Sequence, residues 1–401
     1  MKKIEINNLK VVPKSISKEF KLCAFITPEQ KINNFVQDVK NWIDANNLEV
    51  EFSDNFINVN IPKNIEMSDL FFESKKFEWM DGFSPNLNKK LHIGHLSNLV
   101  LAKAFKSLGI CKKTVSIYGD TLTGEVSKES ALILLKKHLS EFNFHIDKEV
   151  FASEIKYNGN LLKPGTDEYD GTQIFEIDGE KTVGIKSGGQ TSYFYQDVAL
   201  AELLNSPTLY LTGSEQSTHF NMLKKMYPLI EHIGLGLVKV SGKKMASRTG
   251  NVIFVDEFIE QMNEQFNNNI SLIYNLFAGF ILKSNPEVNK GINLDIINNP
   301  KNSAGLYISY TTARLISAGC EIIHFNEFTS RDLEFACLKS RINLKPNVLF
   351  ESLVEYCKEI NSLYGTCIIR GSENNKKMFE EKLSNLVLGI KLLGLFVIEK
   401  V

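Results

Sequence analysis

FSPNLNKKLHIGH, residues 83–95, is the stretch of the chain that decides its fold. A strand-like segment, KKFEWMDGF, runs into it, and a helix-like segment that stops at Gly109 follows it, with an apolar stripe of Leu96, Leu99, Val100 and Leu108. A second strand-like segment, TVSIYGD, comes next. Strand, turn, helix and strand in this order predict a βαβ unit of a parallel sheet, with ligands at the carboxyl ends of its strands.

Helix and strand signals alternate from there to about residue 255. In order they are strand-like QTSYFY, a helix through Asp197 to Leu204, strand TLYLTG, a helix from His219 to Ile230, and strand LGLVKV. A less regular part, with a helix and Asp-Gly hairpin turns, fills residues 121–185. We therefore expect an α/β domain with a doubly wound parallel sheet over residues 73–265, carrying a connecting insertion at about 121–185.

The two ends of the chain differ from this middle. One helix-like stretch, Pro28 to Asn46, and one alternating run, VEFSDNFINVNI, predict a small N-terminal α+β domain over residues 1–72. After Asp256 the strand signals disappear, so we expect an all-helical C-terminal domain over residues 266–401.

Composition limits the functions that the chain could have. Its 46 basic and 47 acidic residues give a net charge of −1, so any contact with nucleic acid has to come from a local patch. The six cysteines form no Cys-x-x-Cys pair, which is typical of a protein of the reducing cytoplasm. The longest apolar segment, Leu386 to Ile398, is short and interrupted by Lys391, so we expect no membrane span.

His92 and His95 stand three residues apart at the expected first turn of a helix. Their side chains therefore share one face, next to backbone N–H groups that favour anions, and both could donate hydrogen bonds to a phosphoryl group. Gly94 between them would let a flat group approach the backbone. An incidental surface pair and a zinc site are the alternatives, although a zinc site would need a third ligand that the motif does not supply.

A second polar segment, SGKKMASRTGN, covers residues 241–251. Gly242 and Gly250 bracket Lys243, Lys244 and Arg248, a composition suited to a mobile basic loop that follows charge between phosphates. Taken alone, such a loop is usually just solvated.

His-Ile-Gly-His together with Lys-Lys-Met-Ala-Ser-Arg resembles the two signatures of class I aminoacyl-tRNA synthetases. The flanking segments are similar to those of the arginyl-tRNA synthetase family: SPN before the first signature, SGGQTSYFYQD, GSEQSTHF, and GLGLVKVSGKKMASRTGNVIFVDEF around the second. The resemblance runs in order from about residue 77 to 270 and continues more faintly in NPKNSAGLYISYTTARL and LLGLFVIE. It implies a Rossmann-type catalytic domain.

The resemblance also implies roles for individual residues. His92 and His95 would stabilise the α-phosphate during attack, and Gly94 would lie under the adenine. Ser247 stands where the second signature of class I enzymes has a lysine, and Lys89 would substitute for it. The residues implied in catalysis are His92, His95, Lys89, Lys244 and Arg248, and those implied in ATP binding are Gly94, His92, His95, Lys244 and Met245.

The amino-acid pocket follows from the same resemblance and from chemistry. A guanidinium offers five donors in a planar fork, so a selective pocket needs rigid carboxylates and other acceptors. The residues that match the pocket of the family are Asp81, Ser84, Asn86, Tyr193, Asp197 and Gln216.

Three departures from the family pattern bear on substrate and acceptor. Asp81 replaces a glutamate, which withdraws the carboxylate by about 1.5 Å, one carbon–carbon bond. Ser97 stands where an arginine is common. We also expect a shortened form or a paralogue, with a reduced N-terminal domain and a helical domain trimmed between Ala336 and Val348.

Two enzymatic hypotheses and one non-enzymatic hypothesis result. The favoured one is ATP-dependent activation of arginine as arginyl-adenylate and transfer to the 3′-terminal ribose of tRNA(Arg). The alternative is a synthetase-derived ligase that passes arginine or an analogue to a non-tRNA amine or peptide, and the third is a binding or regulatory module. We expect ATP with Mg²⁺ but no dedicated protein metal site, with arginine, ATP and tRNA as partners of a cytoplasmic monomer.

Overall fold

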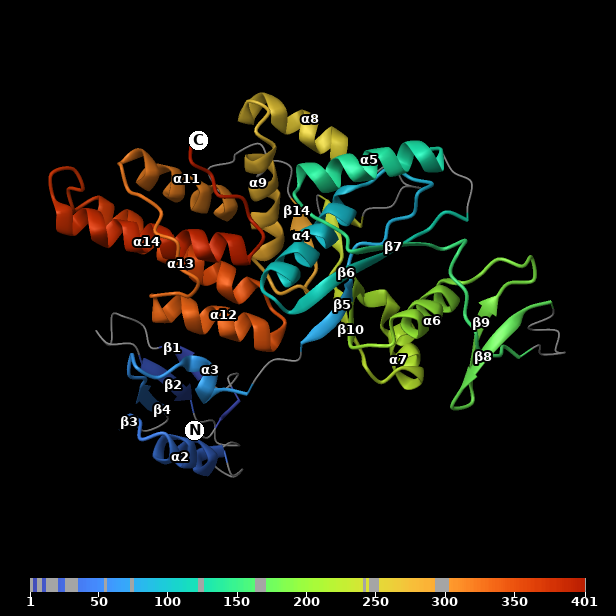
Figure 1. The fold of residues 1–401 in the computed structure, drawn as a ribbon, viewed down its shortest axis with the longest axis horizontal. Helices are drawn as coiled ribbons and strands as arrows, with labels where there is room; N and C mark the ends of the chain where they lie inside the picture. The colour runs from blue at the N-terminus through green and yellow to red at the C-terminus, as the bar shows by residue number, and fades with distance from the viewer. Residues whose placement is uncertain are drawn as a thin grey trace. The chain divides into compact units, whose positions relative to one another are not determined.

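The computed structural model describes residues 3–5, 9–11, 21–25, 35–53, 56–72, 76–121, 126–162, 171–240, 243–244, 252–292 and 303–400. The chain separates into two compact units. The larger one holds Lys76–Tyr310 and Leu393–Ile398, and the smaller one holds Met1–Lys75, Thr311–Leu392 and Glu399–Val401 (Figure 1). None of the described helices is long and apolar enough to cross a membrane.

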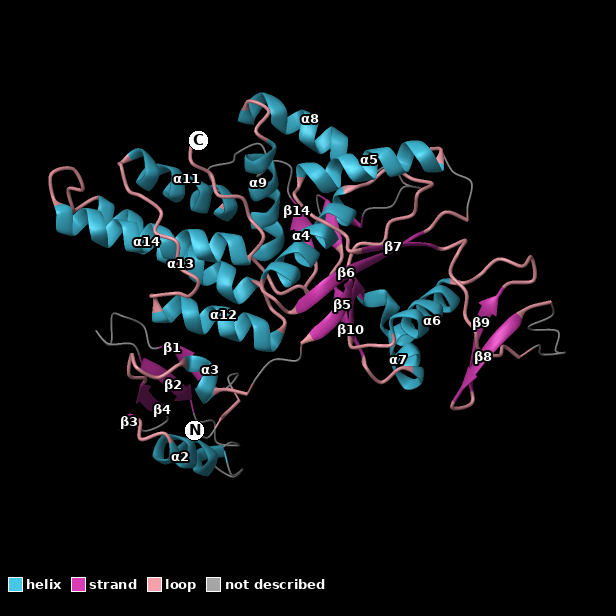
Figure 2. Cartoon of the chain, in the orientation of Figure 1, coloured by secondary structure: helices cyan, strands magenta, loops and turns pink. Residues whose placement is uncertain are grey.

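A parallel sheet forms the centre of the larger unit (Figure 2). Its described strands run in the order β11 (Ile230–Leu235), β10 (Thr208–Gly213), β5 (Phe77–Asp81), β6 (Cys111–Tyr118) and β7 (Lys148–Phe151), and every neighbouring pair is parallel. The chain moves from β5 towards β7 and later returns to β10 on the other side of β5. This reversal is the switch point at which open α/β sheets bind ligands, and it confirms the doubly wound fold.

Helices cover both faces of this sheet. Helices α6 (Tyr193–Leu204) and α7 (Ser217–Met226) share a buried cluster with Tyr210 of β10. Leu211 points to the opposite face, because side chains alternate along a strand, and there Leu211 and Ala102 of α4 (Ile93–Ser107) both lie next to Gly82. Further helices of this unit are α5 (Lys128–Glu141), α8 (Val255–Phe266) and α9 (Ile270–Leu282).

The larger unit also contains two smaller sheets among its described residues. Strands β8 (Gln173–Ile177) and β9 (Glu180–Ile185) of the insertion form the expected hairpin, with positive φ at both Asp178 and Gly179 of its turn. A short sheet joins β13 (Lys243–Lys244), β12 (Val238–Val240) and β14 (Lys290–Ile292).

Three local predictions were wrong. QTSYFY is not a strand, because the Ser192 hydroxyl accepts the backbone N–H of Tyr195 and starts α6 at Tyr193. The predicted helix from His219 stops at Met226, and residues 230–235 form β11. A strand also occurs after Asp256, since β14 pairs in parallel with β12.

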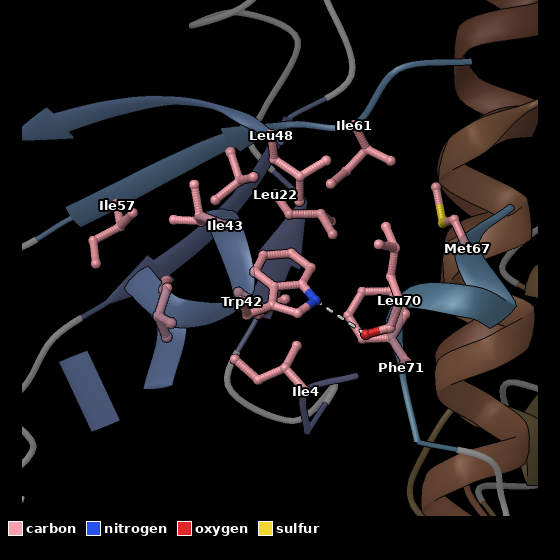
Figure 3. Packing of buried hydrophobic residues seen from close by; sticks show 14 of the residues in the cluster. Ile4, Leu22, Trp42, Ile43, Leu48, Ile57, Ile61, Met67, Leu70 and Phe71 are labelled. Carbon is pink, nitrogen blue, oxygen red and sulfur yellow. Dashed lines mark hydrogen bonds between the residues drawn. The ribbon is translucent and has the colours of Figure 1, made fainter. Parts of the chain in front are cut away.

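The smaller unit is built on an antiparallel sheet in the order β1 (Leu9–Val11), β2 (Lys21–Phe25), β4 (Phe56–Asn60), β3 (Glu49–Ser53). Helices α2 (Phe35–Ala45) and α3 (Met67–Leu70) complete the predicted N-terminal α+β region. Figure 3 shows its core around Trp42, whose indole N–H donates to the Leu70 carbonyl at 3.2 Å.

The helical C-terminal region consists of α11 (Ala304–Ser317), α12 (Arg331–Asn343), α13 (Asn347–Tyr364) and α14 (Glu373–Leu392). Phe335 of α12 belongs to the buried cluster around Trp42, and Arg331 donates to the carbonyls of Pro62 and Ile65. The smaller unit thus groups the first segment of the chain with most of the last. The division into domains at 1–72, 73–265 and 266–401 stays a prediction.

Candidate active site

A cavity of about 480 Å³ lies among residues at the carboxyl ends of β5 and β10. Its walls come from the turn after β5, the end of β6, the start of α6, and the segment from β10 into α7. All six residues predicted to hold the amino acid line it: Asp81, Ser84, Asn86, Tyr193, Asp197 and Gln216. The structure brings these residues together, and their roles in binding stay predictions.

Asp81 ends β5 and is nearly buried, with 4% of its surface exposed. The Ser84 hydroxyl donates to Asp81 Oδ1 at 2.6 Å and accepts the backbone N–H of Ile117 at 2.9 Å. Burial raises the pKa of Asp81 to about 7; the bond from Ser84 opposes this rise and the charge of Asp197 adds to it. The serine therefore holds Asp81 in place but leaves its charge uncompensated.

Asn86 is fixed by its contact with the end of β6. Leu87 donates its backbone N–H to the carbonyl of Gly119 at 2.7 Å, and Gly119 donates to that of Pro85 at 3.3 Å. A Cβ on Gly119 would lie 1.8 Å from Asn86 Oδ1, so only glycine admits this placement of the amide.

Tyr193 and Asp197 lie one turn apart at the start of α6. The tyrosine is 61% exposed, whereas the Asp197 side chain is only 16% exposed. Asp197 Oδ2 lies 2.6 Å from Nε2 of His219, on α7. Burial raises the pKa of Asp197, and the bond with His219 opposes that rise.

His219 was missed by the sequence reasoning. It also lines the cavity, three residues after Gln216. Its signal was the GSEQSTHF segment, from which only Gln216 received a role.

His92 and His95 cap helix α4. Nδ1 of His92 accepts the backbone N–H of Gly94 at 3.1 Å, and Nδ1 of His95 accepts that of His92 at 3.2 Å, with the ring centroids 3.8 Å apart. Because both Nδ1 atoms act as acceptors, the proton of each neutral ring is on Nε2. Burial, then the charges of His92 and Lys89, lower the pKa of His95 to about 3, and burial also lowers that of His92. Both rings are neutral donors at pH 7.

The second signature adjoins the first. Ile93 donates its backbone N–H to Ile253 at 3.0 Å, and Val255 donates to Leu91 at 2.9 Å, so the residues directly after the basic segment pair with those around His92. Lys244 lies in β13, opposite Lys239 of β12. Met245 and Arg248 lie outside the described residues.

Charge in the cavity has one sign. Its described lining includes the carboxylates of Asp81, Asp197 and Glu215 and contains neither lysine nor arginine. Asp81 is buried without a lysine or arginine beside it, which is costly for a charged carboxylate, so this lining favours a cationic ligand. Within the described part of the chain, no group of three or more His, Cys, Asp or Glu side chains could hold a metal ion.

Comparison with known proteins finds relatives that share one name. No protein-family model matches the chain. Arginine–tRNA ligase of Lactobacillus johnsonii is 26% identical over 319 residues, 64% of this chain and 57% of that protein. Arginine–tRNA ligase of Clostridium botulinum is 24% identical over 372 residues, 78% of this chain and 62% of that protein. The chain thus spans less than two thirds of the length of both relatives.

Solved structures agree in fold. The arginyl-tRNA synthetase of Thermus thermophilus superposes with a TM-score of 0.66 at 15% identity, covering 98% of this chain and 96% of that one. That of Plasmodium falciparum gives 0.67 at 18% identity, covering 98% and 95%. These likenesses confirm the Rossmann-type architecture. The chain is similar in sequence to arginine–tRNA ligases over 64% and 78% of its length, and similar in fold to solved arginyl-tRNA synthetases.

Proposed function

We propose that this protein activates arginine with ATP as arginyl-adenylate and transfers the arginyl group to the 3′-terminal ribose of tRNA(Arg). One observation carries the proposal: a cavity with three carboxylates and neither lysine nor arginine in its described lining lies in the same unit as two neutral histidines at a helix N-terminus. The names of the sequence relatives, arginine–tRNA ligase, support the same reaction.

Arginine carries an α-ammonium and a guanidinium, and the cavity offers a carboxylate for each. Asp197, with Tyr193 one turn before it, would accept the guanidinium, and Gln216 lies on the neighbouring segment. Asp81, held by Ser84, would face the α-ammonium together with Asn86. Leaving such carboxylates unpaired penalises neutral amino acids.

Adenylate formation joins a carboxylate oxygen of arginine to the α-phosphorus and breaks the bond to pyrophosphate. Negative charge develops on the phosphoryl oxygens, and the Nε2–H groups of His92 and His95 would donate to them beside the N-terminal N–H groups of α4. Lys89 would neutralise phosphate charge, since its charge already lowers the pKa values of both histidines. Lys244, Met245 and Arg248 complete the proposed nucleotide site.

Transfer then breaks the bond between the arginyl carbonyl and AMP as a ribose hydroxyl attacks. We include magnesium as the counter-ion that ATP brings with it, and we assign no protein ligand to it. A cytoplasmic location, which rests on the scattered cysteines, and a monomeric state remain part of the proposal.

ATP–pyrophosphate exchange tests the activation step. The protein would be assayed with each amino acid in turn, with and without total tRNA. We expect exchange with arginine alone among the amino acids, and only when tRNA is present. Exchange with a neutral amino acid, or with none, would contradict the proposal; exchange with arginine in the absence of tRNA would support the alternative acceptor.

A further inference from the structure

His219 lines the cavity and bonds to Asp197 there. Its Nε2 lies 2.6 Å from Asp197 Oδ2, and the two side chains are 21% and 16% exposed. The histidine comes from α7 and the aspartate from α6, so the bond links the two helices that form this side of the cavity.

Chemistry fixes the direction of this bond. When Asp197 is ionised, its carboxylate can only accept, so the proton of this bond lies on Nε2 and His219 donates. Oδ2 is then occupied, and Oδ1 makes no hydrogen bond with any described residue. One oxygen of Asp197 is held by the protein and the other remains for a ligand.

Aromatic rings hold the imidazole in the orientation that this bond requires. Phe194 meets it edge-on, with centroids 5.1 Å apart at 75°, and Phe220 lies 4.8 Å away at 50°. Burial raises the pKa of Asp197, and His219 is the first cause that opposes the rise. Without the histidine, the carboxylate would lose both a fixed rotamer and a stabiliser of its anionic form.

We propose that His219 is a positioning residue for substrate selection, which holds Asp197 as an ionised acceptor with one oxygen turned to the cationic side chain of the amino acid. This inference rests on the proposed function. A histidine that merely joined α6 to α7 would affect folding and both substrates alike, whereas a positioning residue affects the cationic substrate selectively.

Three variants separate these roles. His219→Gln keeps an N–H donor close to the position of Nε2, and His219→Leu removes it at similar volume. Asn221→Ala, at an exposed position of the same helix, is the matched control. The Michaelis constants for arginine and for ATP would be measured by pyrophosphate exchange with saturating tRNA, and thermal unfolding would be followed in parallel.

We expect His219→Leu to raise the KM for arginine at least tenfold while the KM for ATP stays within twofold. His219→Gln should have an arginine KM much closer to that of the wild type, and the arginine KM of Asn221→Ala should match the wild type. In a protein that already carries Asp197→Asn, His219→Leu should raise the KM for arginine by less than a further threefold, because the carboxylate charge that His219 stabilises is already absent.

Two results would overturn the inference alone: an arginine KM in His219→Leu within twofold of the wild type, or equal losses for arginine and ATP with no rescue by glutamine. Wild-type protein that shows no arginine-dependent exchange would instead overturn the proposed function, and this inference with it.

Discussion

Asp197→Asn is the substitution that probes arginine recognition most sharply. It keeps the shape of the side chain and an oxygen that can still accept the N–H of His219, and it removes only the charge. The Asp197 side chain is 16% exposed and the described lining holds no lysine or arginine, so the guanidinium would be its cationic partner.

The structure bounds the size of the effect. Removing one partner of a buried, hydrogen-bonded charge pair costs about 2–5 kcal/mol. The lower part of that range applies, because Asp81 remains in the cavity to attract a cation. A loss of about 2–3 kcal/mol corresponds to a rise of roughly 30- to 150-fold in the KM for arginine, to the extent that KM follows binding.

Pyrophosphate exchange at varied arginine and varied ATP measures this change, and the KM for ATP should stay within twofold. Glu202→Gln is the matched control, since it removes the same charge from the same helix at a residue that binds Asn158 outside the cavity. An arginine KM for Asp197→Asn within threefold of the wild type would refute the assignment of the guanidinium to Asp197. Equal rises in the KM for arginine and the KM for ATP would also refute this assignment.

Two further predictions concern Gly119 and pH. Gly119→Ala should raise the KM for arginine about tenfold with little change in thermal unfolding, because the new Cβ lies 1.8 Å from Asn86 Oδ1 and only that side chain has to move. Gly188→Ala, whose Cβ would meet nothing within 4 Å, is the control, and equal KM values for the two variants would count against a role for Asn86. Asp81 has its pKa raised to about 7, so the carboxylate that binds a cation is populated only as pH rises, and the KM for arginine should fall by up to about tenfold between pH 6 and pH 8. The same raised pKa means that Asp81 lowers the free energy of unfolding as pH rises from about 4 to about 7. An arginine KM that does not change between pH 6 and pH 8 would contradict the assignment of Asp81. The same pH dependence of KM in Asp81→Asn would also contradict it.

The central sheet could be predicted because its signals are local. The strand before Ser84 and the strand ending at Tyr118 are rich in aromatic and β-branched residues, α4 carries an apolar stripe, and parallel order follows from the alternation of strand and helix. The gathering of Asp81 and Asp197 in one cavity followed from the family resemblance, since the two lie on elements far apart in sequence.

The features that were predicted wrongly or missed depend on single contacts or on partners far away in sequence. QTSYFY is rich in threonine and aromatic residues, as strands are, yet the Ser192 hydroxyl caps a helix that begins at Tyr193. Strand β14 is three residues long and exists because β12 pairs with it. Phe335 lies in a helix, and no local pattern assigns it to the core around Trp42. His219 lacked a role because its partner is 22 residues away in sequence.

Charging of total tRNA with labelled arginine tests the central claim most directly. The wild-type protein should form acid-precipitable arginyl-tRNA that depends on ATP, while labelled lysine and citrulline yield none. Arginine-dependent pyrophosphate exchange without any arginyl-tRNA would contradict the claim that tRNA is the acceptor, and charging with a neutral amino acid would contradict the reading of the carboxylate-lined cavity.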